Sequence, residues 1–99
     1  MIMISAKIHT KEGERLLAAC DAELLGTEHR EGVMRLRVSE IFYGGETITE
    51  ETLAERMRSV TIMNLVGERS VGVALKLGYV SEDAVITIGG TKHAQSVLI

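Results

Sequence analysis

The residues best suited to chemistry lie near the end of the sequence, where two glycines precede a run of polar side chains. Gly89 and Gly90 predict a tight turn, and the sequence GGTKHAQ then offers donors from Lys92, His93 and Gln95. Such donors suit a phosphate, a base edge or a backbone carbonyl. A nucleotide-hydrolysing phosphate loop needs a longer glycine frame, so the segment does not predict one. The alternative is a hairpin turn with solvated polar residues.

The sequence NLVGERSV, at 64–71, is the second candidate for binding an anion. A turn at Gly67 that leads into a helix exposes backbone N–H groups, and Asn64 and Arg69 add polar groups beside them. An apolar turn between two helices is also loosely similar to a helix–hairpin–helix corner, although the first glycine of that motif is missing. The favoured alternative is structural: Gly67 makes the bend, and Glu68 and Ser70 cap the helix.

A basic strip is expected on one strand. The sequence VMRLRVS alternates, so Arg35 and Arg37 share one face, with Arg30 shortly before them. The preceding EHRE is interpreted as a solvated charge run. A local basic strip can meet RNA backbone even on an acidic protein. Pairing with Glu12 and Glu14 on a neighbouring strand is the alternative, and it is slightly favoured.

Cys20 is the single cysteine of the chain, and Asp21 follows it. A nucleophilic cysteine needs a lowered pKa and a nearby base, which His9, His29 or His93 would have to supply. The apolar run LLAAC favours a small buried side chain instead. The scattered histidines show no zinc spacing, so neither a metal nor another cofactor is expected.

Composition excludes several classes of protein. The net charge of −3 over 99 residues is unlike the basic footprint of a strong duplex binder. No apolar run is long enough to cross a bilayer, and the start shows no signal peptide. A lone cysteine suits a reducing compartment. We therefore expect a cytoplasmic protein with no membrane segment and a single domain over residues 1–99.

The elements that must position these residues follow from periodicity. Alternation over residues 2–9 and the sequence RLLAAC predict a β-hairpin around TKEG, and VMRLRVS predicts a third strand. Between them, DAELLGT predicts one helical turn that Asp21 caps and Gly26 ends. The sequence TITEETLAERM predicts a helix, with Thr47 and Glu50 at capping-box spacing.

The second half is predicted to contain a further helix and two strands. Residues 60–66 suit either a strand or a continuation of the preceding helix, and a helix that continues to about Met63 is favoured. A second helix follows Gly67, and the sequences AVITIG and AQSVLI predict a pair of strands joined by a turn at GTKH. The expected fold is α+β: a small single domain with an N-terminal β-hairpin and third strand, two helices and a C-terminal strand pair.

Several of these segments together resemble a known family. The sequences LLAACDAELLG, RLRVSEIFYGG, NLVGERSV and GGTKHAQ look like the archaeal family called domain of unknown function 424, in the same order and over nearly the whole chain. That family is expected to have proline where Lys92 stands, so the turn before His93 is less rigid here. The resemblance implies a small archaeal cytoplasmic protein, and it transfers no activity or site residues. It also implies an association with translation genes, which favours a ribonucleoprotein setting.

Three hypotheses follow, in order of preference. The first is a binding module for RNA or a ribonucleoprotein, with Arg69 and the sequence TKHAQ on one side of the domain; its candidate residues are Arg35, Arg37, Asn64, Arg69, Lys92, His93 and Gln95. The second is a protein-interaction subunit, such as a homodimer that pairs through the edge of the last strand, SVLI. The third is a small enzyme centred on His93 or Cys20.

Overall fold

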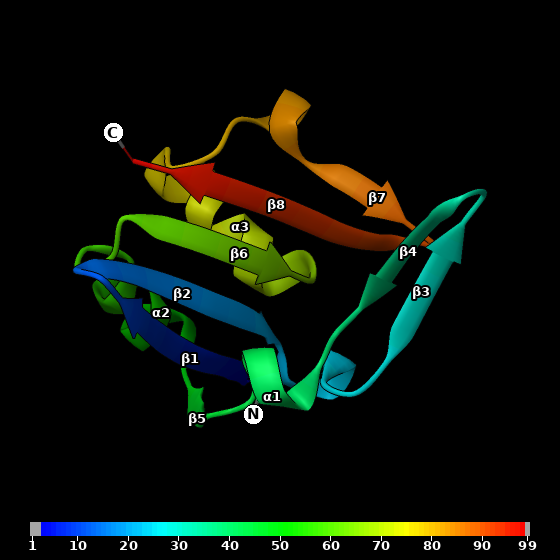
Figure 1. Cartoon of the computed structure of the whole chain (residues 1–99). Helices are drawn as coiled ribbons and strands as arrows, with labels where there is room; N and C mark the ends of the chain where they lie inside the picture. The colour runs from blue at the N-terminus through cyan, green and yellow to red at the C-terminus, as the bar shows by residue number, and fades with distance from the viewer. Residues whose placement is uncertain (1–2, 99) are drawn as a thin grey trace.

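A six-stranded sheet forms the centre of the molecule (Figure 1), which is a computed structural model that describes residues 3–98. The strand order is β5-β1-β2-β6-β8-β7. β2 and β6 are parallel neighbours, and the other neighbouring strands of this sheet are antiparallel. The strands are β1 (Ile4–Lys11), β2 (Glu14–Asp21), β5 (Glu46–Ile48), β6 (Ile62–Val66), β7 (Ile86–Ile88) and β8 (Thr91–Val97).

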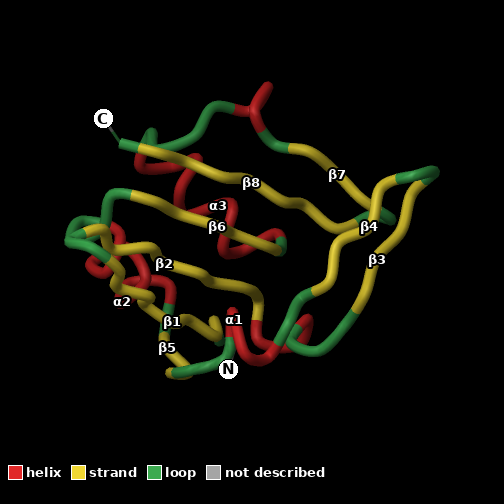
Figure 2. The backbone as a smooth tube through the Cα atoms, viewed as in Figure 1, coloured by secondary structure: helices red, strands yellow, loops and turns green. Residues whose placement is uncertain are grey.

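The two faces of the sheet are covered by different elements (Figure 2). Helices α2 (Glu50–Met57) and α3 (Glu68–Leu77) pack on one side, here called the helix face. Helix α1 (Glu40–Tyr43) and a separate hairpin of β3 (Glu28–Glu31) and β4 (Met34–Arg37) pack on the other side, here called the hairpin face. Short 3₁₀ turns lie at η1 (Ala22–Leu24) and η2 (Glu82–Ala84). Within residues 3–98, no helix is both long enough and apolar enough to span a bilayer.

Each face of the sheet has its own hydrophobic core, because successive side chains of a strand point to opposite sides. Along β2, Leu17 and Ala19 enter the core under α2 and α3, whereas Ala18 and Cys20 enter the core under the β3–β4 hairpin. The first core is completed by α2 and α3, and the second by β4 and by α1, which contributes Tyr43. The side-chain direction on each strand therefore decides which surface a polar residue reaches.

The α+β fold and the N-terminal hairpin are confirmed, whereas the favoured continuation of the helix through residue 60 to about Met63 is wrong. Residues 62–66 form β6, in which Met63 and Leu65 enter the helix-face core and Val66 enters the other core. A central strand with both faces covered has apolar residues at nearly every position, so it lacks the alternation that identifies an exposed strand. The preceding helix ends at Met57 instead.

Two further local predictions are corrected, and one is refined. The sequence EHRE is mostly exposed, as predicted for a charge run, and it forms strand β3, which pairs with β4. β8 begins at Thr91, so His93 lies within a strand and not within the turn. Helix α2 is capped by Thr49, which accepts a hydrogen bond of 3.1 Å from the backbone N–H of Thr52, while Thr47 belongs to β5.

Helix α3 begins against Asp21, at the end of β2. The Asp21 carboxylate accepts hydrogen bonds from the backbone N–H groups of Arg69 at 3.1 Å and Ser70 at 2.9 Å, and from Ser70 Oγ at 3.0 Å. Asp21 is only 2% exposed, so these donors replace the water that the buried charge gives up. The prediction that Asp21 caps its own turn is therefore wrong, since its side chain caps a helix from a distant part of the sequence.

Gly67 is required by this contact. Its φ of 107° confirms the positive φ expected at the turn, and a Cβ atom at this position would lie 2.4 Å from Asp21 Cγ. A side chain at residue 67 would be strained by its backbone and would also displace the carboxylate that caps α3.

We predict that Gly67→Ala lowers the free energy of unfolding by about 2–4 kcal/mol, because backbone strain adds to the weakening of the Asp21 hydrogen bonds. Gly72→Ala is the matched control, since a Cβ at Gly72 in α3 meets no atom within 4 Å. The control should raise stability by about 0.5–1 kcal/mol, as expected for alanine in a helix interior. Denaturant unfolding of both variants measures this, and equal midpoints would contradict the role of Gly67.

Candidate nucleic-acid interface

The side chain of Arg69 lies at the start of α3 and is paired with acids of the same chain. Its guanidinium is 3.8 Å from Asp21 and donates a hydrogen bond to Glu23. That hydrogen bond lowers the pKa of Glu23 and raises the pKa of Arg69. The helix start, a predicted site for an external anion, thus already holds the carboxylate of Asp21. The turn also joins a strand to a helix, so the similarity to a helix–hairpin–helix corner is not supported.

Lys92 lies on the same side of the sheet as Arg69. Its ammonium is 3.1 Å from Glu68, at the first position of α3, and its carbonyl accepts a hydrogen bond of 2.8 Å from Gly67 N–H. The neighbouring Ala94 confirms the direction, because it enters the core under α3. Lys92 therefore helps to hold the start of α3 beside β8.

Asn64, His93 and Gln95 lie on the opposite side, on the hairpin face. His93 is the cross-strand neighbour of Val66, and Gln95 is the neighbour of Asn64. The ring of His93 hydrogen-bonds through Nδ1 to the Leu65 carbonyl at 3.0 Å, which requires the proton on Nδ1. The hydroxyl group of Tyr43 donates to Asn64 Oδ1, while Gln95 is exposed.

The expected single site that contains both Arg69 and His93 is therefore not formed. Residues 92 and 93 are adjacent in β8, so their side chains must leave opposite faces of the sheet. The prediction of a turn at GTKH conceals this consequence, because side chains of a turn need not alternate. Of the candidates on the central sheet and α3, Arg69 and Lys92 lie on the helix face, and Asn64, His93 and Gln95 lie on the hairpin face.

Arg35 and Arg37 lie on the outer side of the β3–β4 hairpin. The strand register places Arg30 opposite Arg35 and Glu28 opposite Arg37, so these four side chains share one face. The Glu28 carboxylate forms ion pairs with Arg30 at 3.2 Å and with Arg35 at 3.5 Å. The side chains of Arg30 and Arg35 remain 66% and 59% exposed. Three guanidinium groups with one carboxylate make a positive surface on this hairpin.

The inner side of the hairpin is fixed to the sheet. His29 hydrogen-bonds to Thr91 in β8 at 3.0 Å, and the Glu31 carboxylate accepts a hydrogen bond of 2.9 Å from Gly89 N–H. Leu36 is buried against the hairpin-face core. These contacts place the arginines on a supported strand pair and not on a free loop.

The pairing with Glu12 and Glu14 that the sequence favours for this strip is wrong. Glu14 lies at the opposite end of the sheet, where it accepts a hydrogen bond from Thr61 Oγ1. Glu28 is the acid that pairs with the arginines. Interpreting EHRE as a solvated charge run misses this role, although the alternation of Glu28 and Arg30 with His29 and Glu31 is a usable signal for a strand.

Cys20 is buried, as predicted, and its surroundings oppose a nucleophilic role. Burial, together with the charges of Asp21 and Glu23, raises the pKa of the Cys20 thiol to about 12. Its cross-strand neighbour on β1 is Ser5, whereas His9 faces Leu16 further along the hairpin. Among residues 3–98, no three histidine, cysteine or carboxylate side chains are grouped to hold a metal ion.

We predict that the native Cys20 thiol reacts with a thiol reagent at mildly alkaline pH far more slowly than the unfolded chain does. The thiolate is the reactive form, and a pKa of about 12 leaves almost none of it in the folded protein. Labelling followed by mass spectrometry, with the protein in denaturant as the control, measures both rates. Equal rates would contradict the burial of this side chain.

Comparisons with known proteins agree with this architecture. A solved structure described as the crystal structure of an uncharacterized conserved protein from Methanopyrus kandleri is similar, with a TM-score of 0.85 and 28% sequence identity. The match covers 98% of this chain and 92% of that one. No curated protein matches with significance. The family described as protein of unknown function (DUF424) matches over residues 9–99. The chain therefore belongs to the DUF424 family.

Proposed function

We propose that the protein is a cytoplasmic RNA-binding module that grips RNA backbone with the outer face of the β3–β4 hairpin. The observation that carries the proposal is the segregation of charge: Arg30, Arg35 and Arg37 share one exposed face with Glu28 alone, on a chain whose net charge is −3. Guanidinium groups suit phosphate because they donate paired hydrogen bonds in a fixed plane. A positive face on an acidic protein directs a polyanion to one place.

The solvent exposure of the ion pairs at this face supports binding over a purely structural role. The pairs of Glu28 with Arg30 and Arg35 are solvent-exposed, so each contributes little to stability. A phosphate can therefore replace Glu28 as a partner at small cost to the fold. Arg37 lies opposite Glu28 on the same face and extends the strip toward the base of the hairpin.

Base contacts are assigned in this proposal to Asn64, His93 and Gln95. They project from β6 and β8 on the same side of the sheet as the hairpin. Amide and imidazole groups can hydrogen-bond the edges of unpaired bases, while the arginines hold phosphates. In this proposal, the amide and imidazole groups determine the preference among RNA sequences, and the arginines provide affinity for the RNA backbone.

Arg69 and Lys92 are left out of the proposed interface. Their charges face Asp21, Glu23 and Glu68 on the other side of the sheet, so they are already paired within the fold. The family resemblance favours a translation setting for a module that binds RNA through its hairpin face.

We predict that Arg37→Gln, and more strongly the double variant Arg35→Gln/Arg37→Gln, weakens binding to a short mixed-sequence single-stranded RNA. The slope of log affinity against log salt should become shallower by about 0.7 for each phosphate that is no longer neutralised. Fluorescence anisotropy over a salt series measures the slope. Arg58→Gln is the control, since it removes the same charge from the exposed end of α2 and should leave the slope unchanged.

The complementary variants separate base contacts from phosphate contacts. Gln95→Ala should change the preference among RNA sequences more than it changes the salt slope, because an uncharged amide releases no counterion. A wild-type protein that binds no RNA at low salt would exclude the proposal. Binding that Arg58→Gln weakens as much as Arg37→Gln would place the interface elsewhere.

A protein-interaction or homodimeric subunit is the second candidate, and the edge of β8 favours it. The hydrogen bonds from Leu98 N–H to the Thr61 carbonyl and from Gly67 N–H to the Lys92 carbonyl fix which residues face β6. Because the backbone groups of successive residues point to opposite edges of a strand, those of Gln95 and Val97 point away from β6. The pairing of β7 with β8 ends at His93, so these groups lie beyond it. Such an edge can add a strand from a partner. Absence of RNA binding together with a stable homodimer would favour this candidate.

A further inference from the structure

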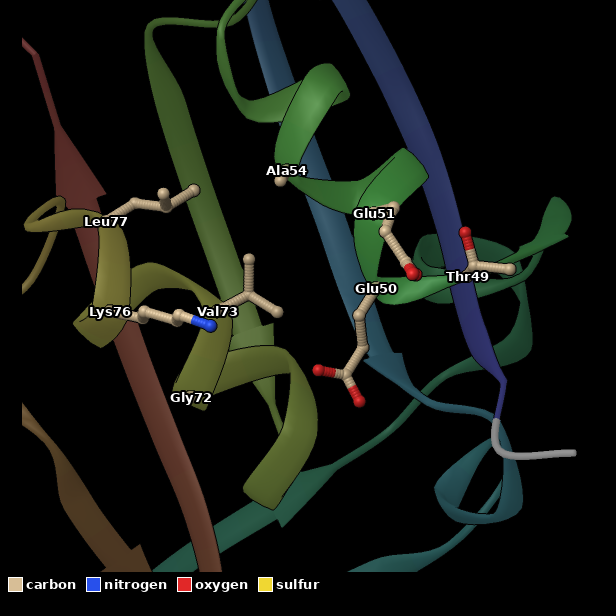
Figure 3. A pocket seen from close by; sticks show the side chains of 8 residues that line it. All are labelled: Thr49, Glu50, Glu51, Ala54, Gly72, Val73, Lys76 and Leu77. Atoms are coloured by element: carbon tan, nitrogen blue, oxygen red, sulfur yellow. The ribbon is translucent and has the colours of Figure 1, made fainter.

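The two sides of the sheet differ in what they offer to a nucleic acid. On the helix face, a groove of about 670 Å³ runs between α2 and α3, and Lys76 lies opposite Glu50 and Glu51 across it (Figure 3). Two carboxylates against one ammonium group disfavour a polyanion there. On the hairpin face, the part of the sheet where β2 and β6 begin and β8 ends lies away from both α1 and the β3–β4 hairpin (Figure 1).

Two rows of side chains cross this uncovered part of the hairpin face. The first row is aliphatic and the second carries two amide groups; in strand order they are Leu16, Ile62 and Val97, then Ala18, Asn64 and Gln95. In the aliphatic row, Leu16 and Ile62 are half-buried and Val97 is 64% exposed. The rows are two residues apart along each strand, which is about 6.6 Å. A flat apolar surface therefore lies beside a line of hydrogen-bonding groups.

The amide group of Asn64 is held in one orientation by Tyr43. The hydroxyl group of Tyr43 donates to Asn64 Oδ1, and the ring that carries it is buried in the hairpin-face core. Burial, and after it the neighbouring Cys20, raises the pKa of Tyr43 to about 12, so the hydroxyl group keeps its proton. Asn64 Nδ2 points away from Tyr43. Within residues 3–98 it has no acceptor and is not buried, so the fold leaves this donor unused.

We propose that one unpaired base of the RNA lies over the aliphatic row and accepts a hydrogen bond at its edge from Asn64 Nδ2, with Tyr43 as the positioning residue. Uracil and guanine carry a carbonyl oxygen where cytosine and adenine carry an amino group. A donor of fixed orientation therefore favours uracil and guanine. The inference rests on the proposed function, in which the hairpin arginines hold the phosphates.

The aliphatic row accounts for the choice of unpaired RNA. Such a row contacts the face of a base, and in a duplex that face is covered by the stacked neighbours. The row alone would suit a protein equally well. The fixed donor beside it, and the three arginines on a hairpin that packs on the same side of the sheet, favour RNA as the occupant.

The test compares oligouridine with oligocytidine of equal length, since the two pyrimidines differ at the edge that Asn64 would contact. The wild type should bind oligouridine more tightly by about threefold to tenfold, the range expected for one hydrogen bond. Tyr43→Phe should bring the two affinities together and leave the salt slope unchanged, because the same phosphates remain neutralised. Tyr79→Phe is the matched control: it removes a hydroxyl group from a tyrosine on the helix face and should keep the preference. Fluorescence anisotropy measures each affinity.

Asn64→Asp is the second variant, because its carboxylate can still accept from Tyr43 but offers an acceptor where the amide offers a donor. Both RNAs should bind more weakly, since the variant adds a negative charge. The preference should reverse toward oligocytidine, whose amino group can donate to the carboxylate. A role of Asn64 in folding alone predicts no reversal, and circular dichroism shows whether the variant is folded.

Three results would overturn the inference. Equal affinities of the wild type for the two RNAs would show that no fixed donor reads the base; if Arg35→Gln/Arg37→Gln still flattened the salt slope, the proposed function would stand without it. A preference that survives Tyr43→Phe would show that Tyr43 does not position Asn64. Competition by duplex RNA as strong as by oligouridine would exclude an unpaired base. Absence of any RNA binding would exclude the proposed function as well.

Discussion

The buried carboxylate of Asp21 is the contact on which the arrangement of this protein depends. It ends β2 and caps α3, so it joins a strand of the N-terminal hairpin to a helix 48 residues away in sequence. Burial of a charge is costly unless donors surround it, and here two backbone N–H groups, a hydroxyl group and a guanidinium do so. The carboxylate also excludes any side chain at Gly67. This contact therefore holds the start of α3 against the end of β2.

The sheet then separates the chemistry of the two surfaces. On the helix face, Arg69 and Lys92 are paired with acids that belong to the same structural corner, so their positive charge serves the fold. On the hairpin face, polar groups of β6 and β8 remain beside a hairpin whose outer side carries three arginines. Net charge alone conceals this division, because a chain with a charge of −3 can still present a positive strip wherever strand alternation sorts its residues.

The β3–β4 hairpin is supported differently from the main sheet. It is a two-stranded sheet of its own, and an isolated strand pair of this length is barely stable in water. Leu36 and His29 hold its inner side against the core and β8. Its inner residues therefore determine stability, while its outer residues are free of packing constraints and available for recognition. A division of this kind lets affinity for a partner change without altering the fold.

The sequence by itself determined the local elements with clear signals. Alternation determined the N-terminal hairpin, the apolar run determined the burial of Cys20, and the turn before α3 determined a positive φ at Gly67. Tertiary structure alone decided the rest. Residues 60–66 became a strand because both faces of the sheet are covered, which removes the alternation that periodicity can detect. The partner of Asp21 and the pairing of Glu28 with Arg35 depend on how distant strands pair, and the separation of Arg69 from His93 depends on β8 lying in the sheet between its two faces. Register brings together residues that are far apart in sequence, so no local pattern contains it.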